Sequence, residues 1–216
     1  MRTFSDLPIL LFDLDGTLVD SLDLILESWR YTMDVHFGDV PEDRVWLESM
    51  GQPLRAQFRR WASSDEEVHA LVETYKEHNH RVHHDLIRPF PGVRDTLTSL
   101  HARGHRLGIV TSKAAHGTTL SLEGCGLEQD WFEVIVTADE PVPHKPDPAP
   151  VLLALERIGG RPEHAAYVGD SVWDMRAGRG AGVTTVAALW GPFDRKLLAE
   201  EEPDRLIEAI QELLPA

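Results

Sequence analysis

Two carboxylates, Asp13 and Asp15, follow a short apolar run in the stretch PILLFDLDGT at residues 8–17. A carboxylate can attack phosphorus and form an acyl phosphate, which divides one difficult hydrolysis into two easier steps. A second acid can protonate the leaving oxygen and then deprotonate the attacking water. In an extended strand, residues i and i+2 point to the same side, so this spacing predicts that both carboxylates serve one substrate.

Polar residues also follow three later apolar runs. They occur in the stretches TSK at 111–113, HKPDPAP at 144–150 and GDSVWD at 169–174, and are Thr111, Ser112, Lys113, Lys145, Asp170 and Asp174. Each acid or hydroxyl taken singly could be a helix cap. Four acids at one site repel one another, however, and such clusters usually persist around a cation or a shared proton. Ligands that are all oxygen favour Mg²⁺ over zinc.

The elements that must position these residues alternate along the chain. Apolar runs predict strands at 8–12, 105–110, 132–136, 165–169 and 183–187. Helical patterns cover 92–102, 113–123, 148–158 and 172–180, followed by a helical tail. This alternation predicts an α/β fold with a doubly wound parallel sheet. Ligands of such sheets bind at the carboxyl ends of the strands, where the polar residues above are expected to gather.

The first predicted strand is separated from the others by a long helical segment. Residues 18–87 have helical patterns throughout and end at the Pro/Gly-rich stretch RPFPGV, residues 88–93. We therefore predict a core formed by residues 1–17 and 88–216, with residues 18–87 inserted as a helical cap domain. The connections near 18–20 and 87–91 are the expected hinge for opening and closing of the cap.

Composition narrows the class of protein. The chain has 216 residues and a formal net charge of −15, which argues against nucleic-acid binding because that requires basic surfaces. No apolar stretch reaches the roughly 20 residues of a membrane span, and the N-terminal run lacks the features of a signal peptide. The single cysteine, Cys125, indicates a reducing compartment. We expect a cytoplasmic protein, with no membrane or nucleic-acid partner.

Together, the motifs resemble those of the haloacid dehalogenase superfamily, in its phosphatase branch with a helical cap after the first motif. DLDGTLVDS matches the DxDGT signature, VTSK the second motif, HKPDPAP the third and GDSVWD the fourth, GDxxxD. The segment AALWG, residues 187–191, resembles the stretch after the last strand of phosphoglycolate phosphatases. Dehalogenases lack an acid at the position of Asp15, so dehalogenation is disfavoured.

The resemblance implies a role for each motif residue. Asp13 would be the nucleophile and an Mg²⁺ ligand, and Asp15 the general acid/base whose backbone carbonyl also binds the metal. Lys145 would neutralise the nucleophile and the phosphoryl group. Asp170 would be the second metal carboxylate. The remaining roles are support of the first loop and substrate binding by Thr17, phosphoryl binding by Thr111 with Ser112 and Lys113, and a direct or water-mediated metal contact by Asp174.

The substrate is expected to be a small phosphorylated metabolite, with 2-phosphoglycolate ranked first. Arg55, in the cap segment 49–58, either meets a second anionic group of the substrate or is a surface arginine. His144 either contacts substrate or faces solvent.

Several alternatives stay open. They are an inorganic pyrophosphatase, a phosphomutase of the β-phosphoglucomutase type and a receiver-like phosphoacceptor domain. Thr17 in DxDGT favours hydrolysis over the mutase, which commonly has valine there. The cluster His80, His83 and His84 could hold a transition metal, although solvated histidines are the expectation. The sequence gives no prediction of the oligomeric state.

Overall fold

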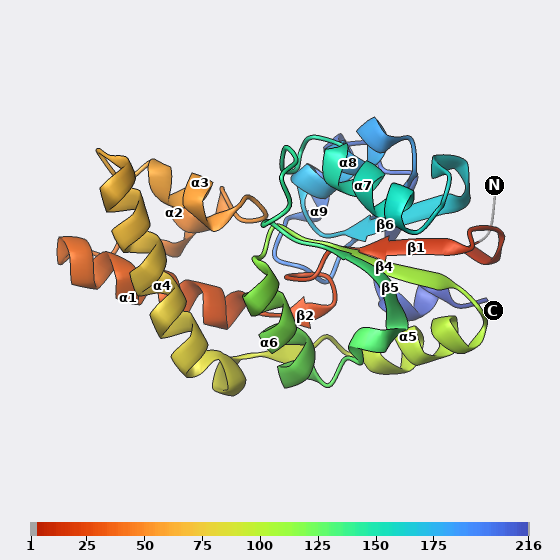
Figure 1. The fold of residues 1–216 in the computed structure, drawn as a ribbon, viewed down its shortest axis with the longest axis horizontal. Helices are drawn as coiled ribbons and strands as arrows, with labels where there is room; N and C mark the ends of the chain where they lie inside the picture. Colours follow the sequence, from red (N-terminus) through yellow and green to blue (C-terminus); the bar gives the residue numbers. More distant parts are fainter. Residues whose placement is uncertain (1–3, 216) are drawn as a thin grey trace.

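A parallel six-stranded sheet forms the core of the computed structural model, which describes residues 4–215 (Figure 1). The strand order is β5-β4-β1-β6-β7-β8, and every neighbouring pair is parallel. The strands are β1 (Ile9–Phe12), β4 (Arg106–Val110), β5 (Phe132–Val136), β6 (Ala165–Gly169), β7 (Thr184–Ala188) and β8 (Arg205–Ile207). The predicted doubly wound α/β fold is confirmed.

Helices cover both faces of this sheet. They are α5 (Val93–Ala102), α6 (Ala115–Cys125), α7 (Ala149–Arg157), α8 (Val172–Ala181) and the short α9 (Arg195–Glu200). Alternate residues of β1 face opposite layers, because Leu10 and Phe12 pack in the cluster that includes α5, whereas Ile9 and Leu11 pack with α7 and α8. A strand buried on both faces reads as the continuous apolar run seen in the sequence.

The end of the chain differs from the predicted helical tail. After α9 it forms the edge strand β8 and a short 3₁₀ helix, Ile210–Leu213. Asp204 holds this segment beside β7, since its carboxylate accepts hydrogen bonds from the backbone N–H (2.8 Å) and hydroxyl (3.0 Å) of Thr185. A strand of three residues is too short to show a periodicity of two, so only the tertiary contact reveals it.

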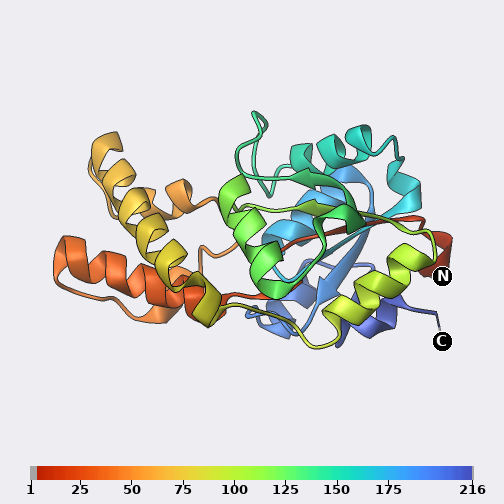
Figure 2. The ribbon, with the colours of Figure 1, turned by 60° about the horizontal axis from the view of Figure 1, so that its bottom comes forward.

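Four helices between β1 and the rest of the sheet form a separate lobe with its own core (Figure 2). They are α1 (Leu22–Phe37), α2 (Asp43–Leu47), α3 (Leu54–Arg59) and α4 (Asp65–Leu86). Aromatic rings fill this core, with the centroid of Trp46 5.6 Å from that of Trp29 and 5.0 Å from that of Phe58. In the described residues, no helix is long and apolar enough to cross a membrane.

The two connections between this lobe and the sheet lie side by side. They form a two-stranded antiparallel ribbon of β2 (Val19–Asp20) and β3 (Arg88–Pro89). The Phe90 N–H also donates to the Leu18 carbonyl at 3.2 Å. The chain thus leaves and re-enters the core at one place, close to Asp13 and Asp15 in the sequence.

Gly108, in the middle of β4, provides a test of the sheet packing. A Cβ at this position would lie 2.6 Å from Val134 Cγ1 and 2.7 Å from Leu11 Cδ2, so both neighbouring side chains must shift. We expect Gly108→Ala to lower the free energy of unfolding by about 1–3 kcal/mol, the usual cost of overpacking. Urea denaturation measures this, and an unchanged midpoint would contradict the packing described.

Candidate active site

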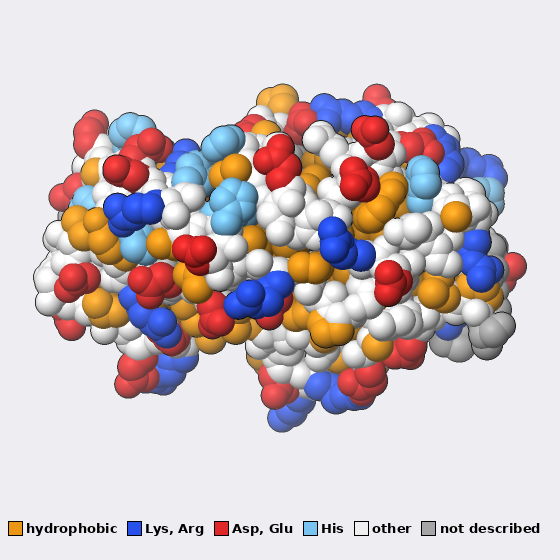
Figure 3. All heavy atoms as spheres, turned by 90° about the horizontal axis from the view of Figure 1, so that it is seen from below, with side chains coloured by type: hydrophobic (Ala, Val, Ile, Leu, Met, Phe, Trp, Pro, Cys, Tyr) orange, Lys and Arg blue, Asp and Glu red, His pale blue; other side chains and the backbone are white. Residues whose placement is uncertain are grey.

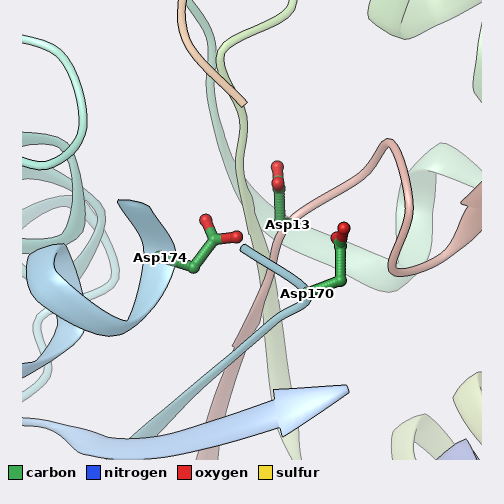
Figure 4. Close-up of side chains that lie close together, drawn as sticks. All are labelled: Asp13, Asp170 and Asp174. Carbon is green, nitrogen blue, oxygen red and sulfur yellow. The ribbon is translucent and has the colours of Figure 1, made fainter. Parts of the chain in front are cut away.

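Three aspartates meet at the carboxyl ends of β1 and β6 (Figure 4). Asp13 follows β1, Asp170 follows β6 and Asp174 lies in the first turn of α8. Each offers a carboxylate oxygen within 4.8 Å of the others, and all three are buried, with exposed fractions of 4, 2 and 0%. The sequence prediction that these acids gather at one edge of the sheet agrees with their positions.

Lys145 is the cation within this cluster. Its Nζ lies 3.0 Å from Asp13 Oδ2 and 2.6 Å from Asp174 Oδ1, and the residue is 4% exposed. The lysine comes from the loop between β5 and α7, so it reaches the nucleophile candidate from a different strand connection. One buried ammonium faces three buried carboxylates, which leaves an excess of negative charge.

The protonation equilibria reflect this excess. Burial, followed by the charge of Asp174, raises the pKa of Asp13 to about 7, although Lys145 opposes the shift. Burial and the neighbouring carboxylates likewise hold the pKa of Asp170 well above its usual range. Burial lowers the pKa of Lys145, but the charges of Asp13 and Asp174 outweigh it and the net shift is upward. A hard divalent cation fits this all-oxygen donor set and would offset the repulsion.

Hydrogen bonds distinguish the aspartates from one another. Both oxygens of Asp174 are occupied, Oδ1 by Lys145 and the Tyr167 hydroxyl (2.8 Å), and Oδ2 by the Ser171 N–H (3.1 Å) and hydroxyl (2.5 Å). Asp170 Oδ1 accepts a bond from Thr17 Oγ1 at 2.7 Å. Since each carboxylate oxygen has two lone pairs, Asp174 has little capacity left for a direct metal contact.

Asp15 forms a second ion pair beside the cluster. Lys113 Nζ lies 2.8 Å from Asp15 Oδ1, and the two side chains are 14% and 20% exposed. β1 ends at Phe12, so both acids follow the strand, and strand alternation does not by itself place Asp15 beside Asp13. The structure instead pairs each acid with its own lysine.

Two residues with hydroxyl groups, Thr111 and Ser112, directly follow β4. Thr111 is buried, and its Oγ1 accepts the Lys113 N–H at 3.1 Å. Ser112 Oγ is buried and has no hydrogen-bond partner among the described residues. A buried hydroxyl without a partner is costly, so Ser112 retains a donor for a ligand.

The structure does not place Arg55 beside the aspartates, lysines and hydroxyls described above. It lies on α3 with a half-exposed side chain, and its Nη2 is 3.6 Å from Oδ1 of Asp65 at the start of α4. In Figure 1 that end of α4 lies far from the sheet. His144 is exposed, in agreement with the alternative that it faces solvent.

The histidines of α4 line the contact between the two lobes. His83 is fully buried, so the expectation of a solvated side chain is wrong for it: its Nε2 lies 3.3 Å from Ser121 Oγ of α6, and burial lowers its pKa to about 4. The His80 ring packs edge to face against that of His116, also on α6. Figure 3 shows histidines gathered where the lobes meet. Among the described residues, the aspartates form the only group of three metal-ligand side chains.

Tyr167 is a site residue that the sequence reasoning missed. Its hydroxyl lies 2.9 Å from the Val110 carbonyl, 2.8 Å from Asp174 Oδ1 and 3.2 Å from Lys145 Nζ, and the residue is fully buried. The available signal was a tyrosine in a strand of small apolar residues, since a buried tyrosine usually has a hydrogen-bond partner for its hydroxyl.

A nucleophile candidate after the central strand, a buried lysine against it and a helical lobe after the first motif define the class of capped α/β phosphatases. The family model for haloacid dehalogenase-like hydrolases matches residues 10–188. The chain therefore belongs to that family. The predicted family and enzyme class are confirmed.

Similar proteins support this assignment over nearly the whole chain. The pyrophosphatase PpaX of Anoxybacillus flavithermus is 37% identical over 205 residues, which cover 95% of this chain and 94% of the relative. A solved structure of a hydrolase from Pseudomonas syringae matches with a TM-score of 0.84 and 27% identity, covering 94% of each chain. A predicted phosphoglycolate phosphatase from Haemophilus somnus shares the fold, with a TM-score of 0.86, 24% identity and 96% coverage of each chain.

The raised pKa of Asp13 predicts a pH dependence of stability in the metal-free protein. The folded value of about 7 exceeds the usual 3.8, so the folded state binds the proton more tightly. Stability from this group is therefore present below about pH 4 and is lost as the pH rises through 7, by roughly 1.4 kcal/mol per pH unit. Relative to Asp13→Asn, which does not ionise, we expect the wild-type free energy of unfolding to fall between pH 5 and 7. A constant difference in EDTA-treated protein would refute this.

Tyr167→Phe tests the missed residue. Removing the hydroxyl leaves Lys145 and Asp174 without a shared partner, and we expect the free energy of unfolding to fall by about 1–3 kcal/mol. The matched control is Tyr31→Phe, where the ring is 37% exposed and the change should be within about 0.5 kcal/mol. Equal denaturation midpoints for both variants would contradict the role of the Tyr167 hydroxyl.

Proposed function

We propose that this protein is an Mg²⁺-dependent phosphatase that forms an aspartyl-phosphate on Asp13, with inorganic pyrophosphate as substrate. The observation that carries the proposal is the buried Asp13 carboxylate in contact with Lys145 at the end of the central strand. A nucleophile held beside a cation suits attack on an anionic phosphoryl group, because the cation reduces the charge repulsion.

Pyrophosphate is preferred over 2-phosphoglycolate because relatives named pyrophosphatase PpaX are 33–37% identical to the chain over nearly its full length. Arg55, the residue expected to meet a carboxylate or a second phosphate of the substrate, lies 3.6 Å from Asp65, and this position favours neither substrate. Lys113 and the Ser112 hydroxyl are the groups that would meet the second phosphoryl group of pyrophosphate.

In the first step, an Asp13 oxygen attacks the phosphorus and the bond to the bridging oxygen breaks. Lys145 holds Asp13 Oδ2, and the Leu14 N–H holds Oδ1 at 2.8 Å, which fixes the carboxylate plane. Thr111 provides a hydroxyl for the oxygens of the transferred phosphoryl group, and Ser112 one for the departing phosphate. Asp15 gives its proton to the departing oxygen, so phosphate leaves.

In the second step, Asp15 accepts a proton from water, whose oxygen attacks the phosphorus and displaces Asp13. Lys113, 2.8 Å from Asp15 Oδ1, keeps this carboxylate in position between the steps. Release of the second phosphate restores the free Asp13 carboxylate. Both proton transfers thus use one side chain that is partly accessible to solvent, as a group that exchanges protons with water must be.

Mg²⁺ would be held by Asp13 and Asp170, together with the Asp15 carbonyl that the family resemblance implies. When bound, it supplies positive charge that favours the anionic substrate. We infer that Asp174 contributes indirectly, because its oxygens already bond to Lys145, Tyr167 and Ser171.

We further propose that residues 18–87 act as a cap on a core formed by residues 1–17 and 88–216. The β2–β3 ribbon is the expected hinge, because both chain connections run through it. Closure would shield the phosphorylated Asp13 and opening would admit water and release phosphate.

Turnover tests the proposed function. With Mg²⁺, the purified protein should release phosphate from pyrophosphate over many cycles, and EDTA should abolish this until Mg²⁺ is restored. Asp13→Asn removes the nucleophile and should lower turnover by at least about a thousandfold. The control is Asp95→Asn, which makes the same charge change at an exposed position on α5 and should leave turnover unchanged.

The alternatives give different outcomes in the same experiment. Faster release from 2-phosphoglycolate than from pyrophosphate would replace the substrate assignment and keep the mechanism. Isomerised sugar phosphate without net phosphate release would indicate a mutase. A single phosphate retained per chain would indicate a phosphoacceptor domain. Borohydride reduction of the acyl phosphate, followed by mass spectrometry, should locate it at Asp13, and a label elsewhere would overturn the assignment.

A further inference from the structure

The segment AALWG, residues 187–191, has no part in the mechanism above, yet it contacts the first motif. Trp190 follows β7, and its indole Nε1–H donates to the Thr17 carbonyl at 2.8 Å. Thr17 Oγ1 in turn donates to Asp170 Oδ1 at 2.7 Å. Two hydrogen bonds through one residue therefore connect the indole to a carboxylate of the proposed metal site.

The backbone of two loops packs closely around the Asp170 carboxylate. A Cβ on Gly16 would lie 2.3 Å from Asp170 Oδ2, and a Cβ on Gly191 would lie 2.4 Å from Asp170 Cβ. Asp170 thus fits between two glycines, one in the first motif and one directly after Trp190. The Trp190–Thr17 hydrogen bond joins these two loops, so it fixes the space in which the Asp170 side chain lies.

Trp190 is partly buried and packs on one side against the core cluster. On its other side it borders a cavity of about 200 Å³ that is also lined by Asp20, Ser21, Leu22, Met50 and Phe90. Thr17, by contrast, is fully buried. Because the ring has open space on the cavity side, the hydrogen bond to Thr17 adds a directional constraint on its orientation to the packing on the other side.

We propose that Trp190 is a positioning residue for Mg²⁺ binding, acting through Thr17 on the orientation of Asp170. This inference rests on the metal site of the proposed function. Groups that orient a metal ligand typically change metal affinity by 10–100-fold when removed. Trp190 acts one residue further from the ligand, so an effect near the lower limit is expected.

Trp190→Phe keeps an aromatic ring and removes the N–H donor. Calorimetric titration of the metal-free protein with MgCl₂ should show about tenfold weaker binding than in the wild type. The matched control is Trp61→Phe, since the Trp61 indole N–H has no hydrogen-bond partner in the part of the chain that the structure describes. It should bind Mg²⁺ as the wild type does. A lower melting temperature with unchanged Mg²⁺ affinity in Trp190→Phe would show a merely structural role and overturn the proposal.

A double-mutant cycle tests the route through Thr17. Thr17→Val removes the hydroxyl at similar volume and should itself weaken Mg²⁺ binding. If Trp190 acts through Thr17, adding Trp190→Phe to Thr17→Val should weaken binding by less than about twofold further. If the double variant weakens Mg²⁺ binding by the product of the two single effects, Trp190 does not act through Thr17 and the proposal is overturned.

Gly191→Ala provides an independent test if Trp190→Phe does not fold. Its Cβ would press on Asp170 while Trp190 and Thr17 stay intact, and Mg²⁺ affinity should fall. Unchanged affinity would contradict the enclosure of Asp170. Failure of the wild-type protein itself to bind Mg²⁺ would overturn the metal site of the proposed function, and with it this inference. Normal wild-type binding with unaffected variants would overturn only the role of Trp190.

Discussion

An excess of buried negative charge is the constraint on which the site depends. Asp13, Asp170 and Asp174 place three carboxylates in a buried site, and the Lys145 ammonium contacts two of them, Asp13 and Asp174. Such an arrangement is unfavourable unless protons, hydrogen bonds or a cation offset the repulsion. The raised pKa of Asp13 is the direct consequence. A divalent cation held by these carboxylates would offset the excess of negative charge.

The surrounding structure holds each carboxylate in a different way. The first-turn position of Asp174 lets it complete a capping box with Ser171 while it anchors Lys145. Asp170 is enclosed by the backbone of two loops and accepts a bond from Thr17. Asp13 accepts one hydrogen bond from the Leu14 N–H and contacts Lys145, which leaves lone pairs free for the nucleophilic role that we propose for it. The sheet provides the framework for these differences, because parallel strands deliver their following loops to one edge.

The helical lobe has a core of its own and joins the sheet domain beside the site. Its aromatic core is separate from the two layers of the sheet, and only the β2–β3 ribbon carries the chain between them. Histidines lie in the contact between α4 and α6. Among them, His83 is buried and neutral at physiological pH. The lobe therefore has its own core yet stays attached beside the first motif, which suits the role of a cap that we propose for it.

The sequence by itself determined the fold class, the order of the strands along the chain and the acids and lysines at their ends. It could do so because buried strands are continuous apolar runs and the motif residues follow them directly. The tertiary structure alone decided which acid pairs with which lysine, that Tyr167 bonds to Asp174 and Trp190 to Thr17, and that Arg55 forms an ion pair with Asp65. It also added β8 at the sheet edge. Those features depend on contacts between residues far apart in sequence, for which local periodicity carries no signal.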